Sequence, residues 1–174
     1  LVQQDNTWRG TQISSSINVG GISDIKYFDD FSNTVSRVGR THITRDIKLE
    51  RLDYNDYGYF RTSIAATDYQ LAKENLVEQY SVLPRVNFEY RSERSDRSFN
   101  YNFNGEIADF DHTLPQKTTG LRMVLYPSIE YPISNPGWEM NTKFGIRHSN
   151  YDLSANDSGA SKTSISKTFP IFSM

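Results

Sequence analysis

The sequence contains no cysteine among its 174 residues. This absence excludes a disulfide scaffold, a thiolate zinc site and a cysteine nucleophile. Excess charge of one sign is also missing, because 19 lysines and arginines face 21 aspartates and glutamates, for a formal net charge of -2. The balance argues against a strongly basic nucleic-acid-binding chain and against a long acidic tail. Only three histidines occur, so metal sites and histidine bases have few candidate residues.

Long hydrophobic runs are absent too. No apolar run approaches the ~18–20 residues of a membrane-spanning helix, and the mean hydropathy is -0.64. Aromatic residues are abundant at 13%, with 11 tyrosines and 10 phenylalanines. An aromatic-rich and polar mixture favours strands. A transmembrane β-barrel has this composition because every second residue faces a wet lumen, and a soluble β-sandwich has it as well.

Apolar and polar residues alternate with period two along much of the chain. In the clearest case, Phe99, Tyr101 and Phe103 alternate with asparagines. The pattern predicts an all-β fold of about eight antiparallel strands. They lie near residues 8–24, 41–54, 58–71, 81–92, 98–112, 120–133, 138–153 and 162–172. Most of them match or exceed the ~9–11 residues that a tilted strand needs to cross a bilayer.

The predicted connections alternate strictly in length. Short turns are expected at 55–58, 93–97 and 134–137, where Asn, Asp, Gly and Pro or a short charged stretch interrupt the alternation. Longer connections are expected at roughly 25–40, 72–80, 113–119 and 154–161. Outer-membrane barrels have short periplasmic turns and longer extracellular loops in this order, whereas a Greek-key sandwich has no reason to keep it. Within 68–79, good helix formers predict either a short loop helix or a strand end followed by a polar loop.

Aromatic residues gather near the ends of the predicted strands. Barrels place such residues in girdles at the membrane–water boundary, and ordinary cross-strand pairing in hairpins is the alternative. The residues are Tyr54, Tyr57, Tyr59, Phe60, Tyr80, Phe110, Trp138 and Tyr151.

Motifs that carry catalytic chemistry are missing. The sequence has no Gly-rich phosphate loop, no H-E-x-x-H and no G-x-S-x-G. The stretch that begins at Asp53 resembles the start of a calcium loop, but its twelfth position is Ile64 and not glutamate. Asp111-His112 could be half of a triad, but no motif ties a serine to it. We therefore predict no catalytic residue, no metal and no cofactor, and a protein that is not an enzyme.

The alternation also predicts which side chains share a face. The positions expected to line a lumen are Asn100, Asn102, Asn104, Glu106, Arg122, Glu130, Glu139, Lys143 and Arg147. The positions expected to face lipid are Phe99, Tyr101, Phe103, Leu125, Ile129, Phe144 and Ile146. In a sandwich the second set would instead be buried between two sheets. Most of the first set would be water-facing positions without individual roles.

Short motifs spread from Trp8 to Met174 carry a resemblance to a known family. They include Ser23-Asp24-Ile25-Lys26-Tyr27-Phe28-Asp29-Asp30-Phe31-Ser32, Leu83-Pro84-Arg85-Val86, Ala108-Asp109-Phe110, Thr119-Gly120-Leu121-Arg122 with Pro127, Pro132 and Trp138, and Pro170-Ile171-Phe172-Ser173. In order and spacing they resemble the β-barrel domain of the lipopolysaccharide-assembly outer-membrane protein family LptD, also called Imp or OstA.

The resemblance implies transport and not catalysis. The family joins a periplasmic jellyroll to a very large barrel in the outer membrane of Gram-negative bacteria, and this sequence would cover a middle part of the barrel. The first and last barrel strands, the lateral seam between them, and the family's disulfide cysteines would lie elsewhere. We expect residues 1–174 to contain neither a jellyroll nor a signal peptide. The partners implied are an LptE-type plug lipoprotein, lipopolysaccharide, outer-membrane lipids and the periplasmic bridge proteins, with no nucleic acid.

Two other functions share part of this pattern. Another outer-membrane porin or channel has every physical feature described above, and only the order of the motifs separates it. A soluble β-sandwich that binds carbohydrate would bury the apolar faces. For a barrel segment we expect an open, curved sheet with two unpaired edges, which other parts of the protein would cover because a bilayer does not tolerate free edges.

Overall fold

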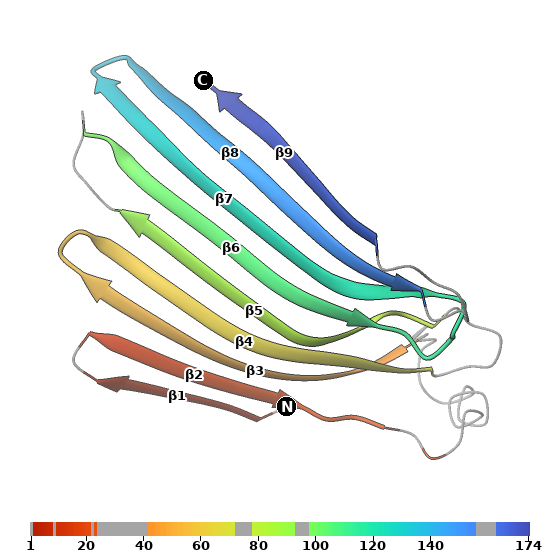
Figure 1. The fold of residues 1–174 in the computed structure, drawn as a ribbon. Coiled ribbons are helices and arrows are strands. Elements are labelled where there is room, and N and C mark those ends of the chain that lie inside the picture. Colours follow the sequence, from red (N-terminus) through yellow and green to blue (C-terminus); the bar gives the residue numbers. More distant parts are fainter. Residues whose placement is uncertain are drawn as a thin grey trace, which may run out of the picture.

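The computed structural model describes residues 2–8, 10–21, 23, 42–71, 78–92, 98–155 and 163–174. These residues form one antiparallel sheet of nine strands, in which each strand pairs with the next one along the chain (Figure 1). The strands are β1 (Val2–Trp8), β2 (Thr11–Asn18), β3 (His42–Asn55), β4 (Gly58–Leu71), β5 (Ser81–Ser92), β6 (Asn100–Asp111), β7 (Thr118–Asn135), β8 (Trp138–Ala155) and β9 (Thr163–Ser173). The predicted all-β, up-and-down architecture is confirmed. None of the described residues belongs to a helix long and apolar enough to cross a membrane.

The number of strands differs from the prediction by one. Residues 8–24 do not form a single strand, because β1 ends at Trp8 and pairs with β2 from Thr11 onward. The segment 2–7 contains only one apolar residue, so it has no alternation from which a strand could be predicted. The glycine at position 10 was the available signal, because a short break between two pairing segments is typical of a hairpin.

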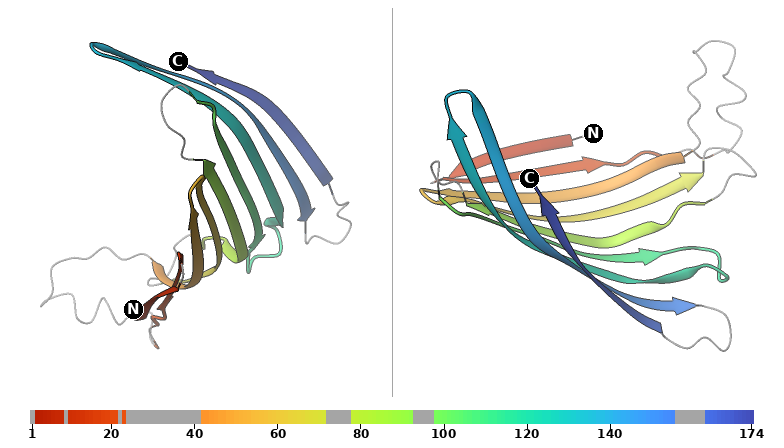
Figure 2. Two further views of the ribbon diagram at one scale, coloured as in Figure 1. Left: turned by 90° about the vertical axis from the view of Figure 1, so that its left-hand side faces the viewer. Right: turned by 90° about the horizontal axis from the view of Figure 1, so that it is seen from above.

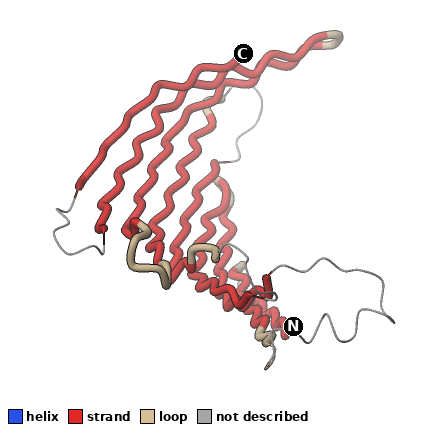
Figure 3. Tube along the Cα trace, turned by 90° about the vertical axis from the view of Figure 1, so that its right-hand side faces the viewer, coloured by secondary structure: helices blue, strands red, loops and turns tan. Residues whose placement is uncertain are grey.

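The sheet is curved. The register is regular along most pairs, but it shifts between Ala65 and Thr67 where β4 meets β5, and between Val82 and Arg85 where β5 meets β6. Such irregularities bend a strand and increase its twist. Figures 2 and 3 show the nine strands bowed in one direction, with β7 and β8 as the longest pair.

The sheet is open. β1 lies at one edge and β9 at the other, and these two strands do not pair with each other. The expectation of an open sheet is confirmed, and what covers the two edges stays a prediction. Only three hydrophobic side chains of the described residues are buried, namely Leu52, Val82 and Ala108. The described part of the chain therefore has no second layer and no conventional core.

The connections sort into two ends of the sheet. The turns at 56–57 and 136–137 lie at what we call the short-turn end. Residues 78–80 and the connection 112–117 lie at the opposite, long-loop end. The predicted strict alternation of lengths is wrong at one place, because 93–99 is no shorter than 112–117. The charged stretch 93–97 does not indicate at which residue β5 ends or at which residue β6 begins. Of the ambiguous segment, Asp68–Leu71 belongs to β4 and 78–80 is not helical, whereas 72–77 lies outside the described residues.

Candidate functional site

Cross-strand register assigns each predicted position to a face. Residues opposite each other in an antiparallel pair point to the same side, and neighbours along a strand point to opposite sides. Asn100 pairs with Glu130, and Glu130 pairs with Lys143, so these three share one face. The same counting places all nine positions predicted to line a lumen on this side, which we call the polar face: Asn100, Asn102, Asn104, Glu106, Arg122, Glu130, Glu139, Lys143 and Arg147.

The predicted apolar positions share the opposite side. Tyr101 pairs with Ile129, and Ile129 pairs with Phe144. Phe99 precedes β6, and its ring lies 4.9 Å from that of Tyr131, which is also on this side. The complete set, which defines the apolar face, is Phe99, Tyr101, Phe103, Leu125, Ile129, Phe144 and Ile146.

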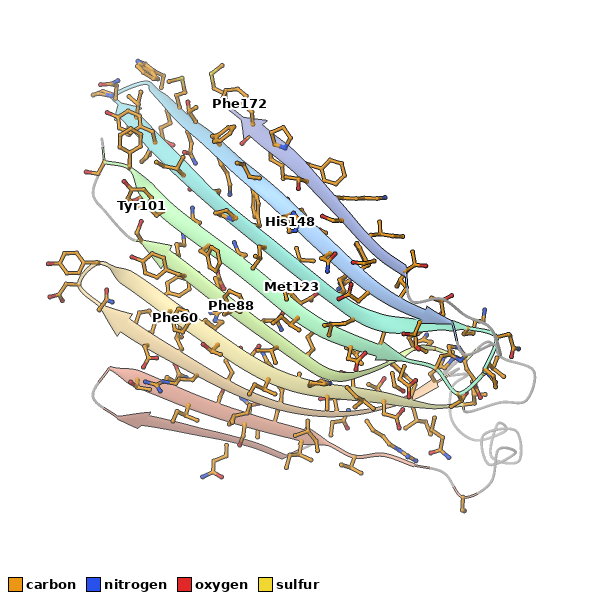
Figure 4. The ribbon with its side chains drawn as sticks, viewed as in Figure 1. Phe60, Phe88, Tyr101, Met123, His148 and Phe172 are labelled. Carbon is orange, nitrogen blue, oxygen red and sulfur yellow. The ribbon has the colours of Figure 1, made fainter. Side chains whose placement is uncertain are left out.

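The apolar face is uncovered. Tyr101 is 47% exposed, Phe144 47% and Ile146 42%, although each is a large hydrophobic residue. The described residues contain a single sheet, so no second sheet packs on these side chains as it would in a sandwich. Figure 4 labels residues that the register places on this face in six successive strands: Phe60, Phe88, Tyr101, Met123, His148 and Phe172.

The polar face is the concave side of the sheet. Side chains converge on the inside of a curve and separate on the outside, so burial without a second layer marks the inside. Most buried side chains within the strands lie on the polar face, and many are small: Leu52, Ser63, Asn102, Ala108, Ser128 and Ser149. The exposed large hydrophobic residues lie mainly on the other side, which is convex.

Glu106 is the centre of a charged cluster on the polar face. Its carboxylate accepts a hydrogen bond from Arg122 Nε at 3.0 Å, across β6 and β7. On the other side, Arg85 Nε of β5 lies 3.7 Å from the second carboxylate oxygen. The Arg122 guanidinium also lies over the ring of Phe110, 4.9 Å from its centroid. One carboxylate thus links three adjacent strands.

Three further ion pairs join neighbouring strands on the same face. Lys143 Nζ lies 2.8 Å from Glu130 across β7 and β8. Arg61 lies 3.4 Å from Glu89 across β4 and β5, and 4.0 Å from Glu50 on β3. Because these groups are partly exposed, each pair stabilises the sheet by only ~0–1 kcal/mol. The pairs leave most of the polar face electrically balanced.

Positive charge without a carboxylate partner remains near the edge strand. Within the described ranges, neither Arg147 nor Lys167 forms an ion pair, and both are exposed. Arg147 lies opposite Phe169, and Lys167 lies opposite Ser149, so the two cations are diagonal neighbours on the polar face of β8 and β9. This arrangement can attract an anion such as a phosphate group.

The aromatic residues at the strand ends do not form one lipid-facing girdle. Tyr54 and Tyr59 are directly opposite each other, with ring centroids 6.1 Å apart, and they lie on the polar face. These two residues therefore form an ordinary cross-strand pair and not part of a lipid-facing girdle. Tyr80, Phe110 and Tyr151 line a 240 Å³ pocket at the long-loop end, beside Arg122. Among the strand-end aromatic residues that belong to strands, Phe60 and Trp138 lie on the apolar face.

Several residues of these ion pairs were not predicted as lumen-lining positions. Arg61, Arg85 and Glu89 take part in ion pairs on the polar face, but the sequence does not say which cation meets which carboxylate. The tight turn at 56–57 fixes the pairing of Arg61 with its neighbours on β3, and that turn was the available signal. Arg51 is visible in the sequence as a break in the apolar alternation, and Asp53 follows it two positions along the strand. The structure places both on the apolar face.

Comparison with known proteins gives a consistent result. The family model for LptD, described as "LPS transport system D", matches residues 3–174. Proteins named LPS-assembly protein LptD from Aromatoleum aromaticum, Azoarcus sp. and Nitrosospira multiformis are similar to this chain. The identities are 29%, 26% and 28%, over 91%, 94% and 97% of this chain. The chain spans 18–20% of the length of these relatives.

An open, curved, up-and-down sheet with one apolar and one polar face is the architecture of a partial β-barrel. The chain belongs to the LptD family, whose model covers it almost from end to end.

Proposed function

We propose that this chain is part of an outer-membrane β-barrel that transports lipopolysaccharide and assembles it in the outer leaflet of a Gram-negative bacterium. The exposed convex face supports this proposal most directly. Its large hydrophobic side chains have no protein cover in the described residues, and lipid is the solvent in which such a face is stable. The identity of the transported molecule is inferred from the relatives, because each of them is named an LPS-assembly protein.

On this proposal the polar face lines the lumen. A wet or protein-filled lumen can solvate the asparagines of β6 and the ion pairs around Glu106 and Glu130, which bilayer hydrocarbon could not. The partners are an LptE-type plug lipoprotein inside the barrel, lipopolysaccharide, outer-membrane lipids and the periplasmic bridge proteins. The balanced charge of most of this face suits contact with a folded plug, and Arg147 with Lys167 suits contact with phosphate groups.

Adjacent residues on β6 offer a matched test of the two faces. In the full-length protein, a photo-reactive side chain at Phe103 should crosslink to lipid, and one at Asn104 should crosslink to a protein inside the barrel or to lipopolysaccharide. Phe103 and Asn104 differ by one position along the strand, so expression level and depth in the membrane are controlled. Crosslinks from both positions to the same molecule would contradict the proposal. So would normal surface lipopolysaccharide in cells that lack the protein.

A further inference from the structure

A groove on the apolar face carries charge at one end. It has a volume of 440 Å³, runs along β3 and β4, and is lined by Leu49, Arg51, Asp53, Phe60, Thr62 and Ile64. The register pairs Leu49 with Ile64 and Arg51 with Thr62, so the lining residues occupy successive rows of one face. The apolar row is open, because Leu49 is 50% exposed and Ile64 51%.

The cation in the groove is held in place and still has donors to offer. Arg51 Nε lies 2.8 Å from one carboxylate oxygen of Asp53, and its Nη2 donates to the other at 3.1 Å. Asp53 also accepts a hydrogen bond from the hydroxyl of Thr11 at 2.6 Å, which fixes the carboxylate from β2. The side chain of Arg51 is nevertheless 62% exposed, so its guanidinium is accessible to a ligand.

The order of these residues along the strands gives the groove a polarity. Arg51 lies between the apolar row of Leu49 and Ile64 and the turn at 56–57. A ligand that follows the groove would therefore place an apolar chain against Leu49 and Ile64 and an anionic group nearer the short-turn end. A guanidinium is well suited to bind phosphate, because it offers several fixed N–H donors.

We infer that the groove binds one glycerophospholipid, with its phosphate on Arg51 and an acyl chain along Leu49 and Ile64. The inference rests on the proposed function, because only a sheet in a bilayer presents this face to lipid. Short turns of outer-membrane barrels are periplasmic, so the lipid comes from the leaflet on that side. The phosphate selects the occupant, because a guanidinium has N–H donors beyond the two that contact Asp53, and an uncharged lipid offers those donors no anionic acceptor.

Retention of lipid by the purified full-length protein tests the inference. Protein in detergent micelles doped with phosphatidylglycerol is analysed by native mass spectrometry, together with Arg51→Gln and Arg51→Lys. Arg51→Gln should retain phosphatidylglycerol about tenfold less well, the loss expected for one charge-assisted contact. Arg51→Lys should retain an intermediate amount, because the charge remains but the fixed N–H donors of the guanidinium are lost. Diacylglycerol with the same acyl chains has no phosphate, so wild type and Arg51→Gln should retain it equally weakly.

Lys48→Gln is the matched control. Lys48 pairs with Glu50 two residues along β3, as Arg51 pairs with Asp53, but on the other face of the sheet. Equal retention by wild type and Arg51→Gln, equal losses in Arg51→Gln and Lys48→Gln, or a preference for lipopolysaccharide over phosphatidylglycerol would each overturn the inference. None of these results would contradict the proposed function, because they concern only the binding of phospholipid in the groove. A wild-type protein that stays soluble without detergent would overturn the proposed function itself.

Discussion

Glu106 and Arg122 are 16 residues apart in sequence and meet across β6 and β7, where the Arg122 side chain donates to the Glu106 carboxylate from Nε at 3.0 Å and also from Nη2. The same carboxylate lies 3.7 Å from Arg85. Removing the negative charge would leave the guanidinium groups of Arg85 and Arg122 close together on the concave side, without the carboxylate that both of them contact.

We therefore expect Glu106→Gln to destabilise the sheet by ~1 kcal/mol, because two partly exposed ion pairs are lost and two cations are left without their shared partner. The midpoint of urea unfolding in detergent measures the change. Glu139→Gln is the control, because Glu139 is exposed and forms no ion pair within the described residues. An equal effect of both substitutions would show that the cluster contributes nothing specific.

The second prediction concerns a glycine that lies beneath an aromatic ring. A Cβ added to Gly105 would overlap the ring of Phe88 on the neighbouring strand. Gly105→Ala should therefore cost ~1–3 kcal/mol through overpacking. Combining it with Phe88→Ala should cost less than the sum of the two single changes, because the ring that clashes is gone. Unfolding midpoints of the two single variants and the double variant measure this coupling, and strictly additive effects would contradict the packing argument.

Two turn glycines with positive φ should respond differently to alanine. Gly137 has a φ of +107° and no atom near an added Cβ, so Gly137→Ala meets only backbone strain of ~1–3 kcal/mol. Gly58 has a φ of +146°, and its Cβ would also overlap the carbonyl oxygen of Arg91 on β5. Gly58→Ala should therefore reduce the amount of folded protein more severely. The heat-resistant, folded fraction on gels compares the two, and a milder effect at Gly58 would contradict this reading of the pairing.

The fourth prediction concerns the free cations of the polar face. Replacing Arg147 and Lys167 together by glutamate reverses the charge beside the edge strand without removing any ion pair of the described residues. The full-length double variant should retain severalfold less lipopolysaccharide on purification, and raising the salt concentration should reduce the difference from wild type. Replacing Lys48 by glutamine changes charge on the same face at a distance and should have little effect. Unchanged retention in the double variant would show that these cations do not contribute to lipopolysaccharide binding.

The sequence predicted the faces of the sheet better than the contacts on them. Alternation depends only on the period of the strand, so it placed Tyr101 and Asn102 on opposite sides correctly. Which cation meets Glu106 depends on the register between strands, and register is set by turns and by irregularities such as the shift between Val82 and Arg85. Local composition does not encode such a shift.

Two features of the sheet were not predicted from the sequence. β1 was missed because an edge strand can be held by backbone pairing to β2 alone and needs no alternating apolar side chains. For the strand-end aromatics, a girdle and cross-strand pairing both stayed open, because position along a strand was known but the face was not assigned. Tyr54 and Phe110 then proved to lie on the polar side.

The order of strands in the sheet is the order of strands in the chain. Every new strand therefore finds its partner immediately before it in the sequence, and no segment has to wait for a distant one. Such a sheet has a low contact order for an all-β protein, which favours rapid assembly by adding one hairpin after another to a growing edge. A protein that enters a membrane as an unfolded chain would gain from this, because its unpaired backbone would be limited at each moment to a single advancing strand.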